Sequence, residues 1–386
     1  MKTENFGGAE RLQQDYFKRI DFGRYTISFG VNSDIFSDYL QKNNLPVELI
    51  LLPKLNKAAR FFEKFRAYWR FFSHVKPHCI VFNQFFLESF TLAEVIAAFL
   101  ITKGNAYMIV HDCPPLPPWG KRYFKRIPAN LSYIKERLHK TLLGFVTKKT
   151  LAVSEAAKKI LVNNYKFPAG NVRVTYHGVD IEEFVPSREN KTRLRQKFNL
   201  SESDTIIVST AMLYPIKRLD RLLKGFEVLA GQRRDIQLLL VGSGSEHQKL
   251  MDMVNSFSEN VRKQIKFLGF RKDILSFLQL SDIFVLTSDS EGLPLACLEA
   301  MACGLISVVT DCGGTSEIIK DGINGFLTEK NPEGIFLGLQ RALNLNNAQR
   351  QAMAMYTRKY IEEKFDLKRN ICSGLNLLKL SPRGGL

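Results

Sequence analysis

The segment Ile283–Leu327, IFVLTSDSEGLPLACLEAMACGLISVVTDCGGTSEIIKDGINGFL, joins an apolar strand, a polar turn, a short helix and a second strand. Ile283–Leu286 is β-branched and aromatic and predicts a buried strand, whereas Thr287–Glu291 predicts a polar turn. Pro294 suits the first turn of a helix, because proline lacks the N–H group that a first turn leaves unpaired. The remaining unpaired N–H groups and the helix dipole favour a nearby anion by about 0.3–1 kcal/mol, so we predict that a diphosphate binds at this corner.

Two carboxylates flank this strand-to-helix corner. Glu291 and Glu299 are eight residues apart, and Leu295, Leu298 and Ala302 fall at the i, i+3, i+7 spacing of a buried helix face. A carboxylate directly beside a phosphate would be repelled by it, so these carboxylates are expected to contact the hydroxyl groups next to the phosphate. Carboxylates accept bidentate hydrogen bonds from vicinal hydroxyls of a ribose or sugar. The pair therefore predicts a sugar nucleotide as the ligand.

Four motifs in this part of the chain occur in the order in which a known family carries them. They are Glu291-x7-Glu299 with Gly292-Leu293-Pro294 inside it, Glu299-Ala-Met-Ala-Cys-Gly304, Asp311-x-Gly313-Gly314-x-x-Glu317 and Asp321-Gly-x-Asn324-Gly325. The ordered set resembles the group 1 retaining glycosyltransferases, family 4 in the sequence classification. The resemblance implies the GT-B fold, an α/β architecture in which two Rossmann-like, doubly wound parallel-sheet domains face a cleft.

The resemblance also assigns roles to the residues of the corner. Glu299 would hold the ribose hydroxyls, and Glu291 would hold the transferred sugar together with the amides that follow it. The expected donor-binding turn consists of Gly292, Leu293, Pro294 and Leu295. No cofactor is implied, because the nucleotide sugar is a substrate, and the absence of an Asp-x-Asp motif predicts no bound metal.

A basic loop follows the strand predicted for Ile206–Leu213. Lys217 and Arg218 resemble the family's loop in which an early arginine and a later lysine hold the donor diphosphate, but Met212 stands at the position of that arginine. A thioether cannot replace a charge-assisted hydrogen bond, which is worth about 1.5–3 kcal/mol. We therefore expect Lys217 to balance the leaving diphosphate, with Arg218 as a partial substitute for the missing arginine.

Further donor and acceptor contacts are expected outside this loop. His111 follows the strand predicted for Ala106–Val110, at the sheet edge where α/β proteins bind ligands. By the resemblance His111 would lie near the transferred sugar and the acceptor; the alternative is a structural histidine with satisfied hydrogen bonds. Gly269 and Phe270 resemble the segment that lines the nucleobase.

The N-terminal residues resemble the family's glycine-rich loop. At Gly7 and Gly8 the missing side chains would let the backbone approach the donor phosphates. Only six residues precede Gly7, although the family has a full strand ahead of this loop. The sequence therefore predicts either a start upstream of Met1 or an N-terminal domain that lacks its first strand.

From Tyr25 onwards, short apolar strands alternate with helical segments, which predicts parallel sheets. The N-terminal strands are expected at Tyr25–Phe29, Val47–Leu52, Ile80–Phe82 and Ala106–Val110. We expect an N-terminal acceptor-side domain at 1–180, a linker at 181–204, a nucleotide-sugar-binding domain at 205–360, and at 361–386 a helix that crosses back to the N-terminal domain, followed by a tail.

The composition restricts the partners. The 386 residues include 55 Lys and Arg against 38 Asp and Glu, a net charge of +17, which indicates a polyanionic neighbour such as anionic lipid, nucleic acid or a phosphorylated substrate. No helix-turn-helix, zinc-finger or ribonucleoprotein motif supports nucleic acid. No apolar run reaches the roughly 20 residues of a membrane span and no signal-peptide core is present, so we expect a cytoplasmic protein. The six cysteines lack C-x-x-C spacing, which fits a reducing compartment and predicts no metal site.

Residues 56–76 predict a helix that is both aromatic and basic. Phe61, Phe65, Tyr68 and Phe72 share one helical face, and lysines and arginines are interspersed among them. Such a helix either rests on an anionic membrane surface, which would make the protein peripheral, or packs its aromatic stripe against the sheet.

Together with the resemblance, these patterns predict a retaining, metal-independent glycosyltransferase. It would move a hexose from a nucleotide diphosphate sugar to a hydroxyl of a glycan or lipid-linked acceptor, in polysaccharide or glycolipid biosynthesis. Two alternatives stay open: a same-fold sugar-nucleotide epimerase or hydrolase would use the same donor pocket, and a degenerate, non-catalytic sugar-nucleotide-binding protein would account for Met212. The donor sugar, its base and the acceptor are not predicted.

Overall fold

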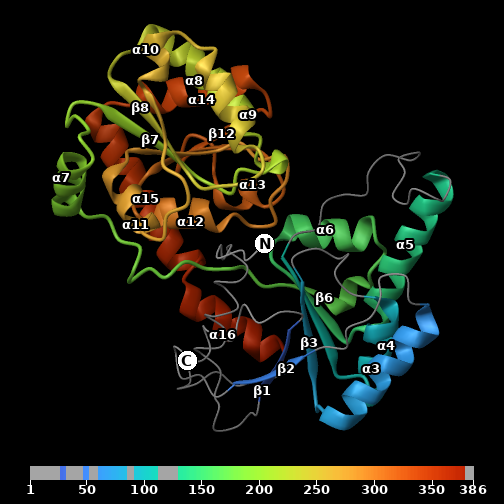
Figure 1. Cartoon of the computed structure of the whole chain (residues 1–386). Helices are drawn as coiled ribbons and strands as arrows, with labels where there is room; N and C mark the ends of the chain where they lie inside the picture. Colours follow the sequence, from blue (N-terminus) through green and yellow to red (C-terminus); the bar gives the residue numbers. More distant parts are fainter. Residues whose placement is uncertain (1–26, 32–46, 52–59, 85–90, 112–128, 379–386) are drawn as a thin grey trace. The chain divides into compact units, whose positions relative to one another are not determined.

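The computed structural model describes residues 27–31, 47–51, 60–84, 91–111 and 129–378, which fall into two compact units (Figure 1). The C-terminal unit comprises residues 177–368. The N-terminal unit comprises the described residues before His177 and those from Arg369 onwards, so the chain returns to it within helix α16 (Leu367–Leu377).

The C-terminal unit contains a six-stranded sheet in which every strand pair is parallel. The strands lie in the order β12–β11–β10–β7–β8–β9. Their bounds are β7 Thr205–Thr210, β8 Ile236–Val241, β9 Ile265–Phe267, β10 Ile283–Leu286, β11 Ile306–Thr310 and β12 Phe326–Thr328. Numbered along the chain, this is the doubly wound order 3-2-1-4-5-6, whose winding reverses between the first strand, β7, and the fourth, β10. Sheets of this kind bind ligands at the carboxyl ends of the strands on either side of the reversal.

Helices cover both faces of this sheet (Figure 1). The main core lies between alternate strand residues, such as Ile207, Leu238 and Val285, and the helices on one face. Those helices are α8 Leu219–Gln232, α9 His247–Asn255 and α14 Pro332–Leu343. The other face is covered by α11 Ile274–Leu280, α12 Leu295–Ala302 and α15 Asn347–Lys364, and the remaining short helices are α10 Glu259–Arg262 and α13 Thr315–Ile318.

The N-terminal unit contains a parallel sheet in the order β3–β4–β5–β6 and a separate parallel pair, β1–β2. The strands are β1 Ile27–Val31, β2 Val47–Leu51, β3 Ile80–Gln84, β4 Ala106–Val110, β5 Lys149–Ala152 and β6 Val172–Val174. The helices are α3 Phe61–Val75, α4 Leu92–Ile101, α5 Ala129–Val146 and α6 Glu155–Asn163. Leu378, which follows α16, packs on Tyr107, Ile109 and Leu151 of this sheet.

Two parallel-sheet α/β units are the architecture that the sequence predicts. The strands predicted at Ile283–Leu286 and Ala106–Val110 match β10 and β4 residue for residue. The strand predicted at Ile206–Leu213 ends at Thr210, and the 3-10 turn Pro215–Lys217 follows it. The question of a strand before Gly7 lies outside the described residues.

The segment 181–204, predicted as a linker, lies in the C-terminal unit and contains α7 (Arg188–Lys197), which packs on α11. Its Arg195 is buried and donates to the Asp282 carboxylate at 2.6 Å. These contacts attach α7 to the C-terminal sheet, because Asp282 directly precedes β10.

Helix α3 packs on α4 and is divided between two environments. Tyr68 and Phe72 are buried in the core of the N-terminal unit, which confirms for these two residues the prediction of an aromatic face that packs inward. Phe61, Phe62 and Trp69 are exposed on the same helix. No helix in the described part of the chain combines the length and the apolar character that a membrane crossing requires.

Candidate active site

The reversal point of the C-terminal sheet brings two predicted site residues into contact. Lys217 follows β7 and Glu291 follows β10, and the Lys217 Nζ donates to the Glu291 Oε1 at 2.6 Å. The Ser288 hydroxyl donates to the same carboxylate oxygen at 2.5 Å. Both side chains of the ion pair are partly accessible, with 25% and 12% of their surfaces exposed. A cation and a carboxylate that a ligand can reach therefore stand together where a doubly wound sheet binds its ligand.

A second group of charges lies beside this pair. The Arg218 guanidinium donates to both carboxylate oxygens of Asp220 at 2.9 Å and to Asp289 at 3.3 Å, and Arg221 donates to Asp289 at 2.6 Å. The hydrogen bond from Arg218 lowers the pKa of Asp220, and the same bond raises the pKa of Arg218. The predicted donor contact Arg218 is thus held by carboxylates in this structure.

Backbone contacts fix the position of Glu291. Its carbonyl oxygen accepts a hydrogen bond from the Gly314 N–H at 3.1 Å. Gly313 approaches so closely that a Cβ at that position would lie 1.8 Å from the same oxygen, and its φ of +60° favours glycine. The glycine pair of the Asp311–Glu317 motif therefore serves to pack the loop after β11 against the loop that carries Glu291.

The turn Gly292–Leu293–Pro294 leads from Glu291 into α12. The helix begins at Leu295, so Pro294 is its N-cap residue and stands one position before the first turn in which the sequence predicts it. Leu293, Pro294 and Glu299 are buried, whereas Gly292 and Leu295 are half-buried. The structure thus carries both predicted carboxylates at one strand-to-helix corner, with Glu299 on the helix and Glu291 in the loop before it.

The predicted base-lining residues follow β9 on the same edge of the sheet. Gly269 has φ +65°, and its carbonyl accepts a hydrogen bond from the Gly242 N–H at 2.8 Å, which ties the turn after β9 to the turn after β8. The Phe270 ring is exposed.

The remaining predicted site residues belong to other parts of the chain. His111 follows β4 in the N-terminal unit, where burial lowers its pKa to about 4, so its imidazole is neutral at pH 7. Gly7 and Gly8 lie outside the described residues.

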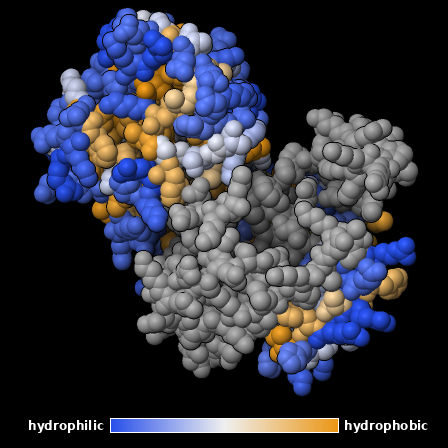
Figure 2. Space-filling view, in the orientation of Figure 1, coloured by the Kyte–Doolittle hydropathy of each residue, from blue (hydrophilic) through white to orange (hydrophobic). Residues whose placement is uncertain are grey.

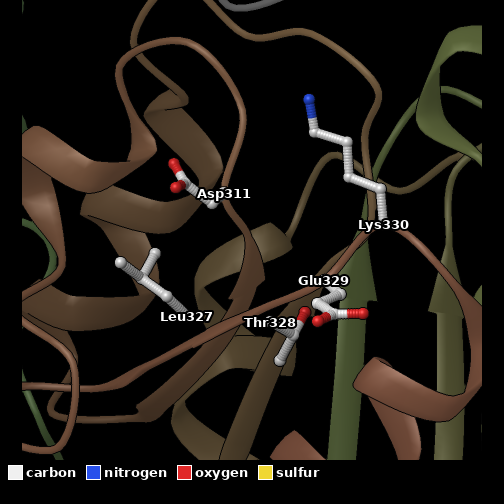
Figure 3. Close-up of a pocket in the computed structure, with 5 residues that line it drawn as sticks. All are labelled: Asp311, Leu327, Thr328, Glu329 and Lys330. Atoms are coloured by element: carbon white, nitrogen blue, oxygen red, sulfur yellow. The ribbon is translucent and has the colours of Figure 1, made fainter.

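A shallow pocket of about 390 Å³ opens at the carboxyl ends of β11 and β12, and sequence reasoning did not identify it. It is lined by Asp311, Leu327, Thr328, Glu329 and Lys330. Figure 3 shows Asp311 and Lys330 on opposite sides of it. The Lys330 Nζ donates to the Asp289 carbonyl at 3.1 Å, which connects the rim of this pocket to the charged loops. Within the described ranges, no three His, Cys, Asp or Glu side chains are grouped as metal ligands.

Two family models match the chain, one over each part of it. The model of the glycosyl transferases group 1 matches residues 190–360, and the model of Glycosyltransferase Family 4 matches residues 27–183. The chain belongs to the group 1 glycosyl transferases. The matched range 190–360 contains Lys217, Glu291 and Glu299, which the sequence assigned to this family on its motifs alone.

Curated relatives of this group 1 glycosyl transferase include enzymes with different substrates. The chain is 30% identical over 162 residues to the N-acetyl-alpha-D-glucosaminyl L-malate synthase of Bacillus anthracis, over 42% of this chain and 41% of that protein. It is 29% identical over 196 residues, half of each chain, to the UDP-Gal:alpha-D-GlcNAc-diphosphoundecaprenol alpha-1,3-galactosyltransferase of Escherichia coli. The match thus spans about half the length of the curated relatives.

Solved structures agree with the group 1 fold over nearly the whole chain. Anabaena Alr3699/HepE in complex with UDP and glucose has a TM-score of 0.76 at 21% identity, covering 98% of both chains. A glycosyltransferase from Rickettsia africae has a TM-score of 0.74 at 21% identity, covering 97% of this chain and 94% of that one. The fold is GT-B, as the sequence predicts.

Proposed function

We propose that this protein is a retaining, metal-independent glycosyltransferase that moves a hexose from a nucleotide diphosphate sugar to a hydroxyl of a glycan or lipid-linked acceptor. The observation that carries the proposal is the contact of Lys217 with Glu291 across the reversal point of the C-terminal sheet. Relatives whose names describe sugar transfer, among them one that acts on a diphosphoundecaprenol-linked sugar, support a role in polysaccharide or glycolipid biosynthesis.

The ion pair suggests how the donor enters. In the structure Lys217 and Glu291 neutralise each other, and a bound diphosphate offers Lys217 a more highly charged partner. Glu291 is then released to accept hydrogen bonds from the sugar hydroxyls, while Glu299 accepts them from the ribose. Gly269 and Phe270 line the base.

The main chemical demand is the negative charge that develops on the β-phosphate as the sugar departs with oxocarbenium character. We propose that Lys217 and the unpaired amides at the start of α12 stabilise this negative charge. The proposal needs no metal ion. The acceptor hydroxyl attacks on the face from which the diphosphate leaves and passes its proton to the leaving phosphate, which retains the anomeric configuration. His111, neutral at pH 7, would hold the acceptor or the sugar by hydrogen bonds.

The test is a turnover screen of UDP-, GDP- and ADP-sugars with glycan and lipid-linked acceptors. Glu291→Ala should abolish transfer, whereas Glu299→Ala should chiefly raise the Kd of the donor. Glu259→Ala is a matched control, because Glu259 forms an exposed 2.7 Å pair with Lys263. Near wild-type turnover of Glu291→Ala would contradict its role. Altered sugar or free nucleotide released without acceptor would indicate an epimerase or hydrolase, and failure to bind any donor would indicate a degenerate protein.

We further propose that α3 contacts an anionic membrane surface. Phe61, Phe62 and Trp69 are 42%, 79% and 38% exposed. Residues 60–76 hold five lysines and arginines against one acid. Figure 2 shows apolar residues between hydrophilic ones at the lower right, where Figure 1 places α3. Exposed aromatics with interspersed cations fit the headgroup region of an anionic bilayer.

A second helix extends the apolar surface of the N-terminal unit. Leu138, Leu142 and Phe145 of α5 are exposed and lie at the i, i+4, i+7 positions of one face. Helix α4 packs against both α3 and α5. Exposed apolar residues of this unit therefore occur on α5 as well as on α3.

Co-sedimentation with vesicles of phosphatidylglycerol and phosphatidylcholine tests the membrane contact. Trp69→Ser with Arg66→Glu should release the protein. Val228→Ser with Lys224→Glu makes the same change of charge on exposed residues of α8 and should leave binding unchanged. Equal sedimentation of both variants would contradict the proposal.

A further inference from the structure

Asp289 lies in the loop after β10 that also carries Glu291, and it is not among the predicted site residues. One carboxylate oxygen accepts from Arg221 at 2.6 Å and the other from Arg218 at 3.3 Å. Its backbone is used as well, because its N–H donates to the Ile216 carbonyl at 2.9 Å and its carbonyl accepts from Lys330 at 3.1 Å. Asp289 thus joins the loop after β10 to the turn after β7 through both its side chain and its main chain.

A hydroxyl group reinforces the same connection. The buried Thr287 donates from its Oγ1 to the carbonyls of Lys217 and Arg218, at 2.9 and 3.1 Å. The backbone on both sides of the Lys217 side chain is therefore tied to residues 287–289. These ties fix the backbone from which the Lys217 side chain reaches the Glu291 carboxylate.

The turn itself has an unfavourable backbone conformation. Arg218 has φ +48° and ψ +42°, in the left-handed region that residues with a Cβ rarely adopt, at a cost of order 1 kcal/mol. Its guanidinium is held in place by Asp220 and Asp289. Ion pairs on both sides of the guanidinium offset this cost, because a turn that relaxed to an ordinary φ would lose them.

We infer that Asp289 and Arg221 are positioning residues that hold the Lys217 ammonium at the point where the donor diphosphate binds. The inference rests on the proposed function and adds to it a pair of side chains that act through Lys217 without touching the donor. Arg221 suits this role because only 14% of its side chain is exposed, and its Nη1 already donates to Asp289.

The inference is tested by asking whether Asp289 acts through Lys217. Binding of UDP, GDP and ADP is measured by calorimetry for wild type, Asp289→Ala, Lys217→Met and the double variant. We expect Asp289→Ala to raise the Kd about tenfold in the wild-type background and less than about twofold in the Lys217→Met background, because residues that act as one unit are not additive. Arg221→Met should behave like Asp289→Ala, and Arg221→Lys should restore most of the affinity.

Asp235→Ala is the matched control, since Asp235 also receives two hydrogen bonds from an arginine, Arg233, but at an exposed site.

Equal losses of affinity from Asp289→Ala in both backgrounds would indicate a direct donor contact and overturn the inference. A lower melting temperature with unchanged Kd would indicate a merely structural pair and overturn it as well, and Asp289→Asn repeats the test should the alanine variant not fold. If wild type transfers sugar while every Asp289 variant binds nucleotide equally well, the inference fails and the proposed function stands; if wild type binds no nucleotide, both fail.

Discussion

Replacing Asp282 by alanine should strongly destabilise the C-terminal unit. Asp282 accepts hydrogen bonds from Arg195 at 2.6 Å, from Lys191 at 2.5 Å and from the Ile206 N–H at 2.7 Å. Arg195 is only 3% exposed and donates its other hydrogen bonds to backbone carbonyls. Those carbonyls belong to Leu280, Ser201, Glu202 and Asp204. The variant therefore leaves a buried guanidinium without the one carboxylate that neutralises it.

The expected loss follows from the burial of this charge. Breaking a buried ion pair by removing one partner costs about 3–5 kcal/mol, because the remaining charge stays desolvated. Asp235→Ala removes an equally well-formed pair, but Arg233 and Asp235 are 37% and 49% exposed, and exposed pairs contribute about 0–1 kcal/mol. The two variants should thus differ by about 3 kcal/mol in the free energy of unfolding.

Urea denaturation measures both losses. The chain has two tryptophans, Trp69 and Trp119, and both precede the C-terminal unit, so unfolding of this unit is followed by far-ultraviolet circular dichroism. Hydrogen exchange of the β7 amides gives an independent measure, since the Ile206 N–H is itself bonded to Asp282. If Asp282→Ala unfolds at the same urea concentration as Asp235→Ala, the argument from burial is wrong.

Three further predictions concern single residues. Burial lowers the pKa of His111 from 6.5 to about 4, so the unfolded chain binds the proton before the folded chain does as the pH falls. The free energy of unfolding should therefore drop by about 3 kcal/mol between pH 6.5 and 4. Urea denaturation of His111→Gln across the same pH range should not show this loss. Gly313→Ala should destabilise by about 1–3 kcal/mol and reduce transfer, because the new Cβ displaces the Glu291 carbonyl, whereas Gly231→Ala on the open side of α8 should not lower the melting temperature. Burial raises the thiol pKa of Cys297 and Cys303 to about 12 and that of Cys312 to about 11, so these thiols should react with a disulfide reagent at pH 8 only after denaturation.

Strands that are buried on both faces could be located from the sequence, whereas contacts between distant loops could not. Ile283–Leu286 is a short β-branched and aromatic run between polar residues, and such a run has few conformations other than a strand. The contact between Lys217 and Glu291 joins residues 74 positions apart. Local pattern gives each residue its place at a sheet edge, but the strand order that makes β7 and β10 neighbours depends on packing of the whole sheet.

Ionic side chains were the least predictable part. The segment 181–204 is so polar that its composition indicates a linker, yet Arg195 is buried there. Three carbonyls near the end of the same segment surround its guanidinium, together with the distant Leu280 carbonyl and the Asp282 carboxylate. The role of Asp289 was equally hard to predict, because its sequence context indicates only an acidic turn. Charge alone says that such residues prefer water; only the partners show that two of them are buried or bridging.

The two outermost strands of the C-terminal sheet, β9 and β12, are each three residues long. Long, flat border strands expose rows of unpaired amides and carbonyls, on which a strand of another molecule can add and start aggregation. Edge strands of three residues offer too few unpaired amides and carbonyls for such an addition to be stable. The four inner strands can therefore stay almost wholly buried without making the protein prone to self-association through its sheet, which is useful in a protein that must keep six parallel strands in one core.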